Sequence, residues 1–460
     1  MENTQKSIYY LEKAPVPTAI AHMAIPMILG MVANMVYNIT DAYFIGMLES
    51  TAMLASITLA LPFTTILMAL GEMFGTGGGT YISRLLGEKN MDGVKKASSV
   101  NFYLALLSGI VFMLICLPIL PSILTVLGAI GETQLYTKDY ILVYIIGGPF
   151  VIANFALAQT IRAEGAATES MIGMVGSVII NIILDPVFIF LFHMGVMGAA
   201  VATVIANACA VAYYIYYLKR KSSVQSVSVK DFKPTKEMLV NIFKIGISAF
   251  LLSGFLVVSG LIFNNYAVMY GAHVVAAFGV ANRLCQISDF IGFGLYLGVV
   301  PLIAFSYASN NMERLNKILK TTTLYLVTIV LSIAIVLFAF RVQVLEMFSA
   351  DKDVITVGVV ILSALLVSTL FAGLSGLLTS MFQAFGKGLQ SNVMSVVRGI
   401  ALIPMIIVGN AIFQLNGVIW SITASEIFAC LIGLLLWLVS KKGIMETAPD
   451  ERAAFDMEGM

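Results

Sequence analysis

The chain has 460 residues, of which 59% are hydrophobic and only 11% are charged, with a mean hydropathy of +0.96 and a net charge of +1. Soluble domains are nearer 45–50% apolar and about 25% charged, so this composition excludes a soluble protein, a disordered chain and a disulfide scaffold. A net charge so close to zero also excludes a general attraction to nucleic acids, which leaves a polytopic membrane protein.

The polar N-terminal stretch, residues 1–19, lacks the apolar core and small-residue cleavage site of a signal peptide. The runs that follow are long enough to cross a membrane, and they do not alternate as the strands of a transmembrane barrel do. They predict an all-α integral membrane protein with twelve transmembrane helices, at residues 18–46, 51–76, 97–119, 138–158, 168–190, 195–218, 239–268, 273–303, 318–340, 354–380, 391–413 and 416–440.

The distribution of Lys and Arg predicts the orientation of these helices. With the N-terminus inside, 20 of the 26 basic residues fall in the inside segments and three in the outside loops. We therefore expect a multi-pass protein of the cell (inner) membrane with both termini cytoplasmic.

A repeat links distant parts of the chain at one constant spacing. The Asn at position 90 recurs at position 311, and we call the separation between these two positions the repeat offset. Thr203 pairs with Ser425 at this offset plus one residue. Six helices are an even number, so the two halves enter the membrane from the same side as a parallel repeat. The expected organisation is an N-terminal lobe at 1–218, a cytoplasmic basic linker at 219–237, a C-terminal lobe at 238–445 and a disordered tail at 446–460.

Carboxylates inside a bilayer are costly and mark candidate functional sites. Five lie within the predicted spans: Asp41, Glu72, Asp185, Asp289 and Glu426. Asp41 lies roughly 34 Å and Asp185 roughly 26 Å along helices that start inside, which places both in the outer half of the first lobe. Thr203, roughly 12 Å below the outer start of its helix, has a similar depth. Asn181 lies four residues before Asp185, on the same helix face.

These residues predict a site for a coupling cation. Two carboxylates, an amide oxygen and a hydroxyl suit Na⁺, which we expect to fit at Asp41, Asn181, Asp185 and Thr203. A proton is the alternative, because two neighbouring carboxylates in a low dielectric do not both ionise easily. A purely structural role also stays open for Asp185, because Pro186 predicts a helix kink that leaves a backbone carbonyl free for a nearby polar group.

The remaining features in the spans leave more than one interpretation. Pro26 predicts a bend in the first span. The presence of a proline at this position is explained equally well by a simple irregularity in packing. Glu426 either attracts cationic substrate or is buried beside a hydroxyl or backbone partner. Glu72 and Asp289 are candidates to line a vestibule that opens to the inside. Both would then lie on the translocation path of the substrate, and Asp41 would lie further along this path. Arg398 is expected to pair or to extend to the membrane interface.

Several other sites are disfavoured by the residues present. The stretch GTGGGT from Gly75 lacks the Lys-Ser/Thr that follows a phosphate-binding loop, so ATP is not expected, and small residues there allow close helix contact. The chain has no HExxH or GxSxG motif, which argues against an enzyme. The four Cys and three His show no metal-binding spacing, and we expect no cofactor.

The sequence resembles the multidrug and toxic compound extrusion (MATE) family, in its MepA-like branch, along nearly its whole length. The stretches that carry the resemblance are YFIG at 43–46, FGTGGGTYISRLLGEKN at 74–90, NIILDPVFIF at 181–190, FKIGISAF at 243–250, GVVPLIA at 298–304 and GVIWS at 417–421. The resemblance implies a two-lobe, V-shaped antiporter that exports lipophilic, often cationic, drugs in exchange for H⁺ or Na⁺ by alternating access, and we expect it to function as a monomer.

The resemblance also implies particular site residues. Related proteins carry the first-lobe cation site on the positions of Asp41, Asn181, Asp185 and Thr203, with Tyr37 and Asn154 close by. Other branches hold acidic ligands on the first and fourth helices of the second lobe, but residues 239–268 and 354–380 contain no acid. This departure favours coupling in the first lobe.

Two other functions remain as alternatives. A lipid-linked oligosaccharide flippase of a related superfamily would need cationic residues for a pyrophosphate, and only Lys244, Arg283 and Arg398 are available within or near the spans. A channel or receptor is the alternative from another class. A channel passes current without a coupling gradient, whereas an antiporter does not.

Overall fold

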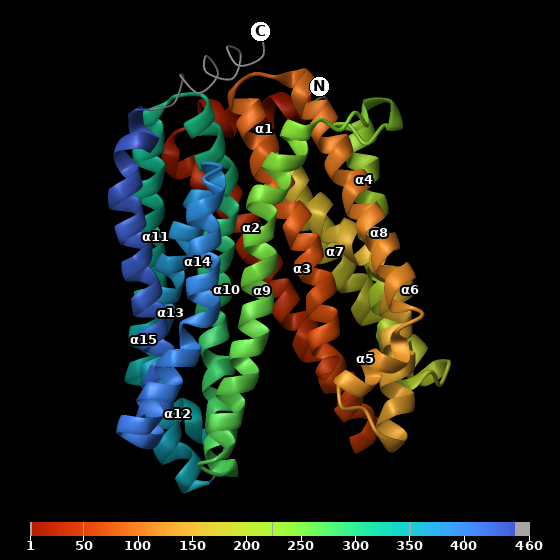
Figure 1. Ribbon diagram of the computed structural model, residues 1–460, viewed down its shortest axis with the longest axis vertical. Helices are drawn as coiled ribbons and strands as arrows, with labels where there is room; N and C mark the ends of the chain where they lie inside the picture. Colours follow the sequence, from red (N-terminus) through yellow and green to blue (C-terminus); the bar gives the residue numbers. More distant parts are fainter. Residues whose placement is uncertain (1, 49, 223, 349–350, 447–460) are drawn as a thin grey trace. The chain divides into compact units, whose positions relative to one another are not determined.

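The computed structural model describes residues 2–48, 50–222, 224–348 and 351–446 (Figure 1). All regular elements within these residues are helices, and eleven segments are long and apolar enough to cross a membrane. These segments are α2 (Val16–Gly46), α3 (Thr51–Gly87), α4 (Met91–Cys116), α6 (Gly131–Ala163), α7 (Ala167–Pro186) with the π-helical turn η1 (Val187–Leu191), α8 (Gly195–Arg220), α9 (Lys236–Val268), α10 (Ala272–Ala308), α11 (Met312–Ala339), α13 (Lys352–Ala384) and Gly388–Ile444. The predicted all-α membrane fold is confirmed.

The last segment contains two of the twelve predicted spans. It comprises α14 (Gly388–Ile400) and α15 (Leu402–Glu446). As one straight helix its 57 residues would extend about 85 Å, far more than the roughly 30 Å of a bilayer core. The backbone leaves the helical conformation at Gln414, where φ is 51° and ψ is −129°.

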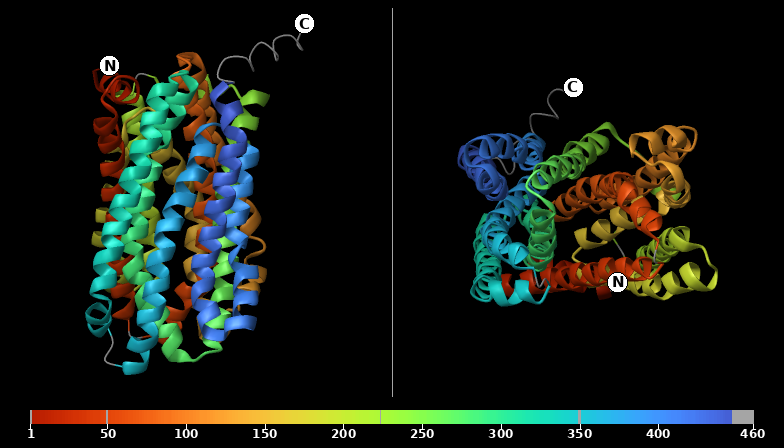
Figure 2. Two further views of the ribbon diagram at one scale, coloured as in Figure 1. Left: turned by 90° about the vertical axis from the view of Figure 1, so that its left-hand side faces the viewer. Right: turned by 90° about the horizontal axis from the view of Figure 1, so that it is seen from below.

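Contacts on either side of Gln414 show that the chain doubles back there. Gly409 packs directly against the backbone of Gly417, and the Gln390 amide donates to the Ser440 hydroxyl at 3.3 Å. Both pairs are centred within one residue of Gln414, as expected for an antiparallel helical hairpin. The α14 and α15 ribbons accordingly lie side by side in both views (Figures 1 and 2).

The backbone confirms the repeat. Lys89 and Asn310, which the repeat offset relates, have φ values of 59° and 56°. His193 and Gln414, at the same offset, have φ values of 54° and 51°. Residues other than Gly rarely adopt positive φ, so its recurrence at one offset indicates that the two halves share turn geometry as well as helix order.

Three short helices were not predicted. They are α1 (Glu2–Glu12), α5 (Leu120–Val126) and α12 (Arg341–Glu346). None is long enough to give a membrane-length apolar signal, which is why a hydropathy argument misses them. The α1 helix packs on the turn between α6 and α7, where a Cβ added at Gly165 would meet the Ser7 carbonyl.

The described chain forms two compact units whose boundaries lie inside helices. The first contains the chain up to Lys13 and Leu29–Phe250. The second contains Ala14–Ile28 and the chain from Leu251 onward. The first part of α2 therefore belongs with the later helices, and the first part of α9 belongs with the earlier ones. Pro26 lies inside α2, two residues before the boundary at Ile28, and the bend expected there stays a prediction.

Close glycine contacts explain why α9 joins the first unit. A Cβ added at Gly77 on α3 would collide with the carbonyl oxygen of Ile242 on α9, and one added at Gly246 would collide with the Met73 carbonyl. Glycine lets the two backbones approach closely. The GTGGGT stretch thus serves helix packing, as the sequence predicted.

The connection between α8 and α9 is held against the first unit. The Ser98 hydroxyl on α4 donates to the Ser226 carbonyl at 3.1 Å and accepts from the Ser226 amide at 2.9 Å. The Tyr103 hydroxyl donates to the carbonyl of Val227, whose side chain is buried. These residues of the segment predicted as a basic linker are therefore packed and hydrogen-bonded.

Glu164, in the turn between α6 and α7, anchors the start of this connection. Its carboxylate is fully buried and accepts hydrogen bonds from the Tyr217 hydroxyl at 2.6 Å and the Ser222 hydroxyl at 2.7 Å. Burial raises the pKa of Glu164 to about 7, although the hydrogen bonds from Tyr217 and Ser222 act in the opposite direction and the charge of Glu169 adds to the rise.

This pKa gives a pH dependence of stability with a definite sign. The folded state binds a proton at Glu164 more tightly than the unfolded chain, so its contribution is complete below about pH 4.5 and is lost as the pH rises through about 7. The difference is at most about 3 kcal/mol. We expect the thermal unfolding midpoint of the detergent-solubilised protein to decrease as the pH is raised from 5 to 8. In Glu164→Gln this decrease should be smaller. Equal slopes in the two proteins would contradict this assignment.

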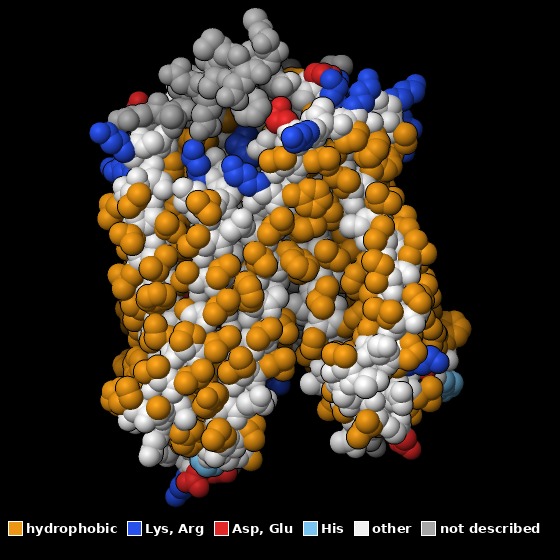
Figure 3. Space-filling view, in the orientation of Figure 1, with side chains coloured by type: hydrophobic (Ala, Val, Ile, Leu, Met, Phe, Trp, Pro, Cys, Tyr) orange, Lys and Arg blue, Asp and Glu red, His pale blue; other side chains and the backbone are white. Residues whose placement is uncertain are grey.

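Charge is distributed unevenly along the helices. In each unit, Lys and Arg side chains gather near one end of the helices, and hydrophobic side chains cover most of the flanks on the face shown in Figure 3. Exposed hydrophobic residues are abundant on α2, α9 and α15, including Ile39, Leu261 and Leu438. Such flanks are suited to lipid contact rather than to water.

Candidate functional site

The first unit brings together the two carboxylates predicted to form the cation site. Asp41 lies on α2 and Asp185 near the end of α7. The Asp185 side chain is completely buried and that of Asp41 is half-buried. Their charges are close enough to interact with each other and with the Tyr144 hydroxyl on α6. The sequence placed both acids at similar depth, and the structure brings them to one place.

Asn181 joins Asp185 to Thr203. Its side-chain nitrogen donates to Asp185 Oδ1 at 3.3 Å and to Thr203 Oγ1 on α8 at 3.2 Å. The spacing of four residues puts Asn181 and Asp185 on one face of α7, as predicted. Both donor hydrogens of the amide are thereby used, which turns its carbonyl oxygen toward other partners.

Thr203 organises the site from α8. Its hydroxyl lies 3.0 Å from the Ala199 carbonyl, to which it donates, and 3.3 Å from the Tyr37 hydroxyl, and its Oγ1 accepts from the Asn181 amide at 3.2 Å. Thr203 thus holds Tyr37 and Asn181 in place.

Asn154 reaches the same network through Asn207, a residue that the sequence analysis missed. The Asn154 amide donates to the Asn207 side-chain carbonyl at 2.6 Å, and the Asn207 amide donates to the Thr203 backbone carbonyl at 2.7 Å. Asn207 lies four residues after Thr203, so the helical spacing could have identified it. Tyr140 and Tyr144, four residues apart on α6 with their hydroxyls 3.5 Å from each other, were also missed.

Four buried oxygens in this network have no hydrogen-bond partner among the described residues. They are Asp41 Oδ1, Asp185 Oδ2, Asn181 Oδ1 and Asn154 Oδ1. Buried polar atoms are nearly always paired, and those left over require an explanation. All four are acceptors, so a cation or a proton would satisfy them whereas an anion would not. These four oxygens therefore suit Na⁺ or H⁺, and the prediction that Thr203 also binds the cation stays a prediction.

The backbone changes form beside this site. The α-helix α7 ends at Pro186, and the π-helical turn η1 follows it directly. Pro cannot donate to the carbonyl four residues earlier, and π-helical turns are frequent at functional sites. The sequence predicted an irregularity at Pro186, but the wider turn could not be read from it.

Glu72 lies in the first unit but outside this network. Its carboxylate accepts from the Gln159 amide, which in turn accepts from the Thr76 hydroxyl at 3.3 Å, and its charge interacts with the buried Arg162. Glu72 thus has partners of its own on α3 and α6. The structure does not join it to Asp41.

The two remaining acids lie together in the second unit. Glu426 Oε2 accepts from the Ser375 hydroxyl at 2.8 Å and lies 3.9 Å from Arg398 Nε. The charge of Asp289 on α10, whose side chain is exposed, interacts with both Glu426 and Arg398. Glu426 therefore has the hydroxyl partner that was one of its two alternatives. Arg398 pairs with Glu426 and does not stand alone.

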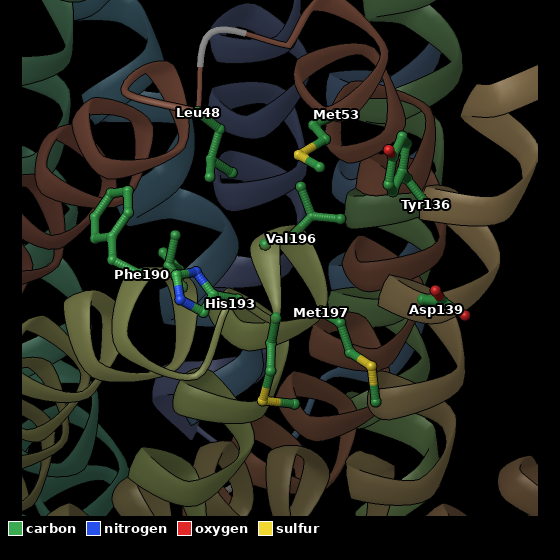
Figure 4. Close-up of a pocket in the computed structure, with 11 residues that line it drawn as sticks. Leu48, Met53, Tyr136, Asp139, Phe190, His193, Val196 and Met197 are labelled. Carbon is green, nitrogen blue, oxygen red and sulfur yellow. The ribbon is translucent and has the colours of Figure 1, made fainter.

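A separate cavity of about 390 Å³ lies in the first unit beside η1. Figure 4 shows Tyr136 and Asp139 of α6 on one side, and His193 and Phe190 on the other. Met53, Met194 and Met197 also line it, but none of the predicted cation ligands does. The cavity is therefore distinct from the cation site.

Comparisons with known proteins agree with this architecture. Residues 26–187 and 248–408 match the family model described as MatE. The chain is 41% identical over 431 residues to the multidrug export protein MepA of Staphylococcus aureus, covering 94% of this chain and 95% of that protein.

Solved structures show the same fold. A crystal structure of MATE in complex with MaL6 aligns with a TM-score of 0.90 at 24% identity, covering 96% of this chain and 100% of that chain. The outward-facing conformation of a multidrug resistance MATE family transporter of the MOP superfamily also gives a TM-score of 0.90 at 24% identity, with coverage of 96% and 99%. With a family match over both halves and a relative at 41% identity along nearly its whole length, the chain belongs to the MATE family of membrane transporters.

Proposed function

We propose that the protein exports lipophilic, often cationic, compounds in exchange for a cation that binds at Asp41, Asp185, Asn181 and Asn154. The main observation that supports this proposal is that four buried oxygens of the first unit have no hydrogen-bond partner among the described residues. The name of the staphylococcal relative, a multidrug export protein, supports the choice of substrate class. The coupling ion is Na⁺ or H⁺, because both satisfy the same oxygens.

The residues have distinct roles in this proposal. Asp41 and Asp185 supply the negative charge that holds the ion, and the Asn181 and Asn154 oxygens complete its coordination. Tyr37 and Thr203 position these groups through their hydrogen bonds. Export by alternating access requires that the ion bind one conformation more tightly than the other. A site that joins α2, α6, α7 and α8 provides this difference, because a shift of any of these helices changes the coordination.

The other acids differ as candidates for the translocation path. Glu72 and Glu426 are held by partners in their own units, whereas the Asp289 side chain is exposed. Asp289 is thus the most accessible of these three acids, although the charge of Arg398 acts on it as well. Arg398 is paired with Glu426, which weakens the case for a flippase that would need free cations for a pyrophosphate.

Transport in inside-out vesicles tests the proposed function. Uptake of ethidium should follow an imposed ΔpH or an imposed Na⁺ gradient, and the effective gradient identifies the ion. Uptake that responds to neither gradient, or a current without substrate, would contradict an antiporter. The second outcome would support the channel alternative.

The orientation needs a separate test. We propose that both termini are cytoplasmic, supported by the bias of 20 basic residues to three. Single cysteines at Lys230 and Glu132, both exposed, should be labelled from opposite sides by a membrane-impermeant maleimide. In intact cells Glu132→Cys should react and Lys230→Cys should not. The reverse pattern would overturn the orientation.

A further inference from the structure

A cluster of charged side chains in the second unit has no role in the proposed coupling. Arg398 on α14 and Glu426 on α15 face each other with side chains only 13% and 17% exposed, and the Ser375 hydroxyl on α13 holds the same carboxylate. Asp289 and Tyr296 approach from α10, where a spacing of seven residues puts them on one face. Tyr296 is hydrogen-bonded to Arg398, and Asp289 interacts with both charged partners.

The repeat relates this cluster to the cation site of the first unit. The repeat offset carries Asn154 onto Ser375, and Ser425, the neighbour of Glu426, is the repeat partner of Thr203. The same offset carries Ser177, one helical turn before Asn181, onto Arg398. The same three helices of each half therefore contribute to both clusters, although the acids stand at different positions.

The two clusters differ in what balances their negative charge. In the first unit, oxygens of Asp41 and Asp185 have no partner among the described residues. In the second unit, a guanidinium fixed to the chain lies 3.9 Å from Glu426, is hydrogen-bonded to Tyr296 and interacts with the charge of Asp289. The guanidinium is part of a side chain, so this cation cannot leave the site as a free ion can.

We propose that Arg398 is a tethered cation that occupies the second unit's counterpart of the coupling site, so that only the first unit exchanges an ion. This inference rests on the proposed function only for the identity of the first site. It predicts that removing the guanidinium leaves Asp289 and Glu426 as a carboxylate pair able to take up Na⁺ or a proton.

The test measures cation-dependent stabilisation of the purified full-length protein. Unfolding midpoints are recorded with and without Na⁺ at constant ionic strength, and across pH, for Asp185→Asn and for Asp185→Asn/Arg398→Met. The second protein should gain a rise of several degrees with Na⁺ or with falling pH that its parent lacks. Glu164 is present in both chains, so its pH response cancels in the comparison. Adding Glu426→Gln should abolish the gain.

Controls separate this proposal from the proposed function and from simple misfolding. Arg398→Lys keeps the charge and should behave like its parent. If Asp185→Asn alone kept the full cation response, the assignment of the coupling site in the first unit would be wrong. The comparison of Asp185→Asn with Asp185→Asn/Arg398→Met would still decide the proposal for Arg398. A folded Arg398→Met variant without any added cation response would overturn it.

If Arg398→Met does not fold, a charge-balanced variant decides the matter. Removing both charges in Arg398→Met/Glu426→Gln should restore folding, because a buried carboxylate without its partner is more costly than a neutral pair. Recovery of folding would support a guanidinium that neutralises Glu426. A double variant that misfolds as severely as the single one would contradict it.

Discussion

Replacing Asp185 by Asn is expected to reduce gradient-driven ethidium transport to the level of vesicles that lack the protein. Asn keeps the size of the side chain and an oxygen that can accept from Asn181, so the protein should still insert and bind substrate. It removes one of the two charges that we propose hold the ion, and a site that no longer binds the ion cannot couple its gradient to export. The measurement is uptake into inside-out vesicles with expression matched by immunoblot.

Two further variants make this result specific. Asp139→Asn is the matched control, because Asp139 is another acid of the first unit that lines the cavity beside η1 rather than the cation site. It should transport normally. Asp41→Asn should fail like Asp185→Asn, and the double variant should be little worse than either single one, because the two acids act as a unit. Normal transport by Asp185→Asn would leave Asp185 as a helix-end residue beside Pro186.

Replacing Gly77 by Leu should reduce the amount of folded protein severely. The added side chain would be forced into the Ile242 carbonyl of α9, where the facing group is backbone and cannot rotate away. Overpacking of this kind typically costs about 1–3 kcal/mol and more where the backbone must move. We expect a lower unfolding midpoint and a loss of the monodisperse peak in size-exclusion chromatography.

Gly254→Leu provides the control for this second variant. A Cβ at Gly254 of α9 meets nothing within 4 Å, and Leu favours a helix over Gly by somewhat less than about 1 kcal/mol. This variant should be as stable as the parent or slightly more stable. If Gly77→Leu were equally well tolerated, the close approach of α3 and α9 would not be needed for folding.

Most residues of the proposed cation site could be singled out from the sequence, because charge inside a membrane is rare and costly. Asp41 and Asp185 stood out as acids in apolar spans, and helix spacing linked Asn181 to Asp185. Asn207 and the tyrosines of α6 were missed because neutral polar residues in a span give a weak signal. The sequence also could not show that Thr203 bonds to Asn181 while the Asn154 oxygen has no partner among the described residues, since both depend on the direction of individual side chains.

The second unit shows the same limit. Glu426, Asp289 and Arg398 were each visible as charges in spans, but they lie on three helices separated by long stretches of sequence. No periodicity connects them. Only packing of α10, α14 and α15 brings the guanidinium to the two acids, which identifies the partners of Arg398 that the sequence left open.

The sequence by itself determined the membrane class, the helix order and the repeat, because the bilayer imposes a minimum apolar length and the duplication preserved local turn geometry. Tertiary structure alone decided which helices pack together. Gly77 on α3 receives α9, and its repeat partner Gly298 on α10 receives α2 at Met23. The compact units therefore divide α2 and α9 instead of following the two halves of the sequence. Hydropathy reports how apolar a helix is, whereas the choice of neighbour depends on where two backbones can approach without a side chain between them.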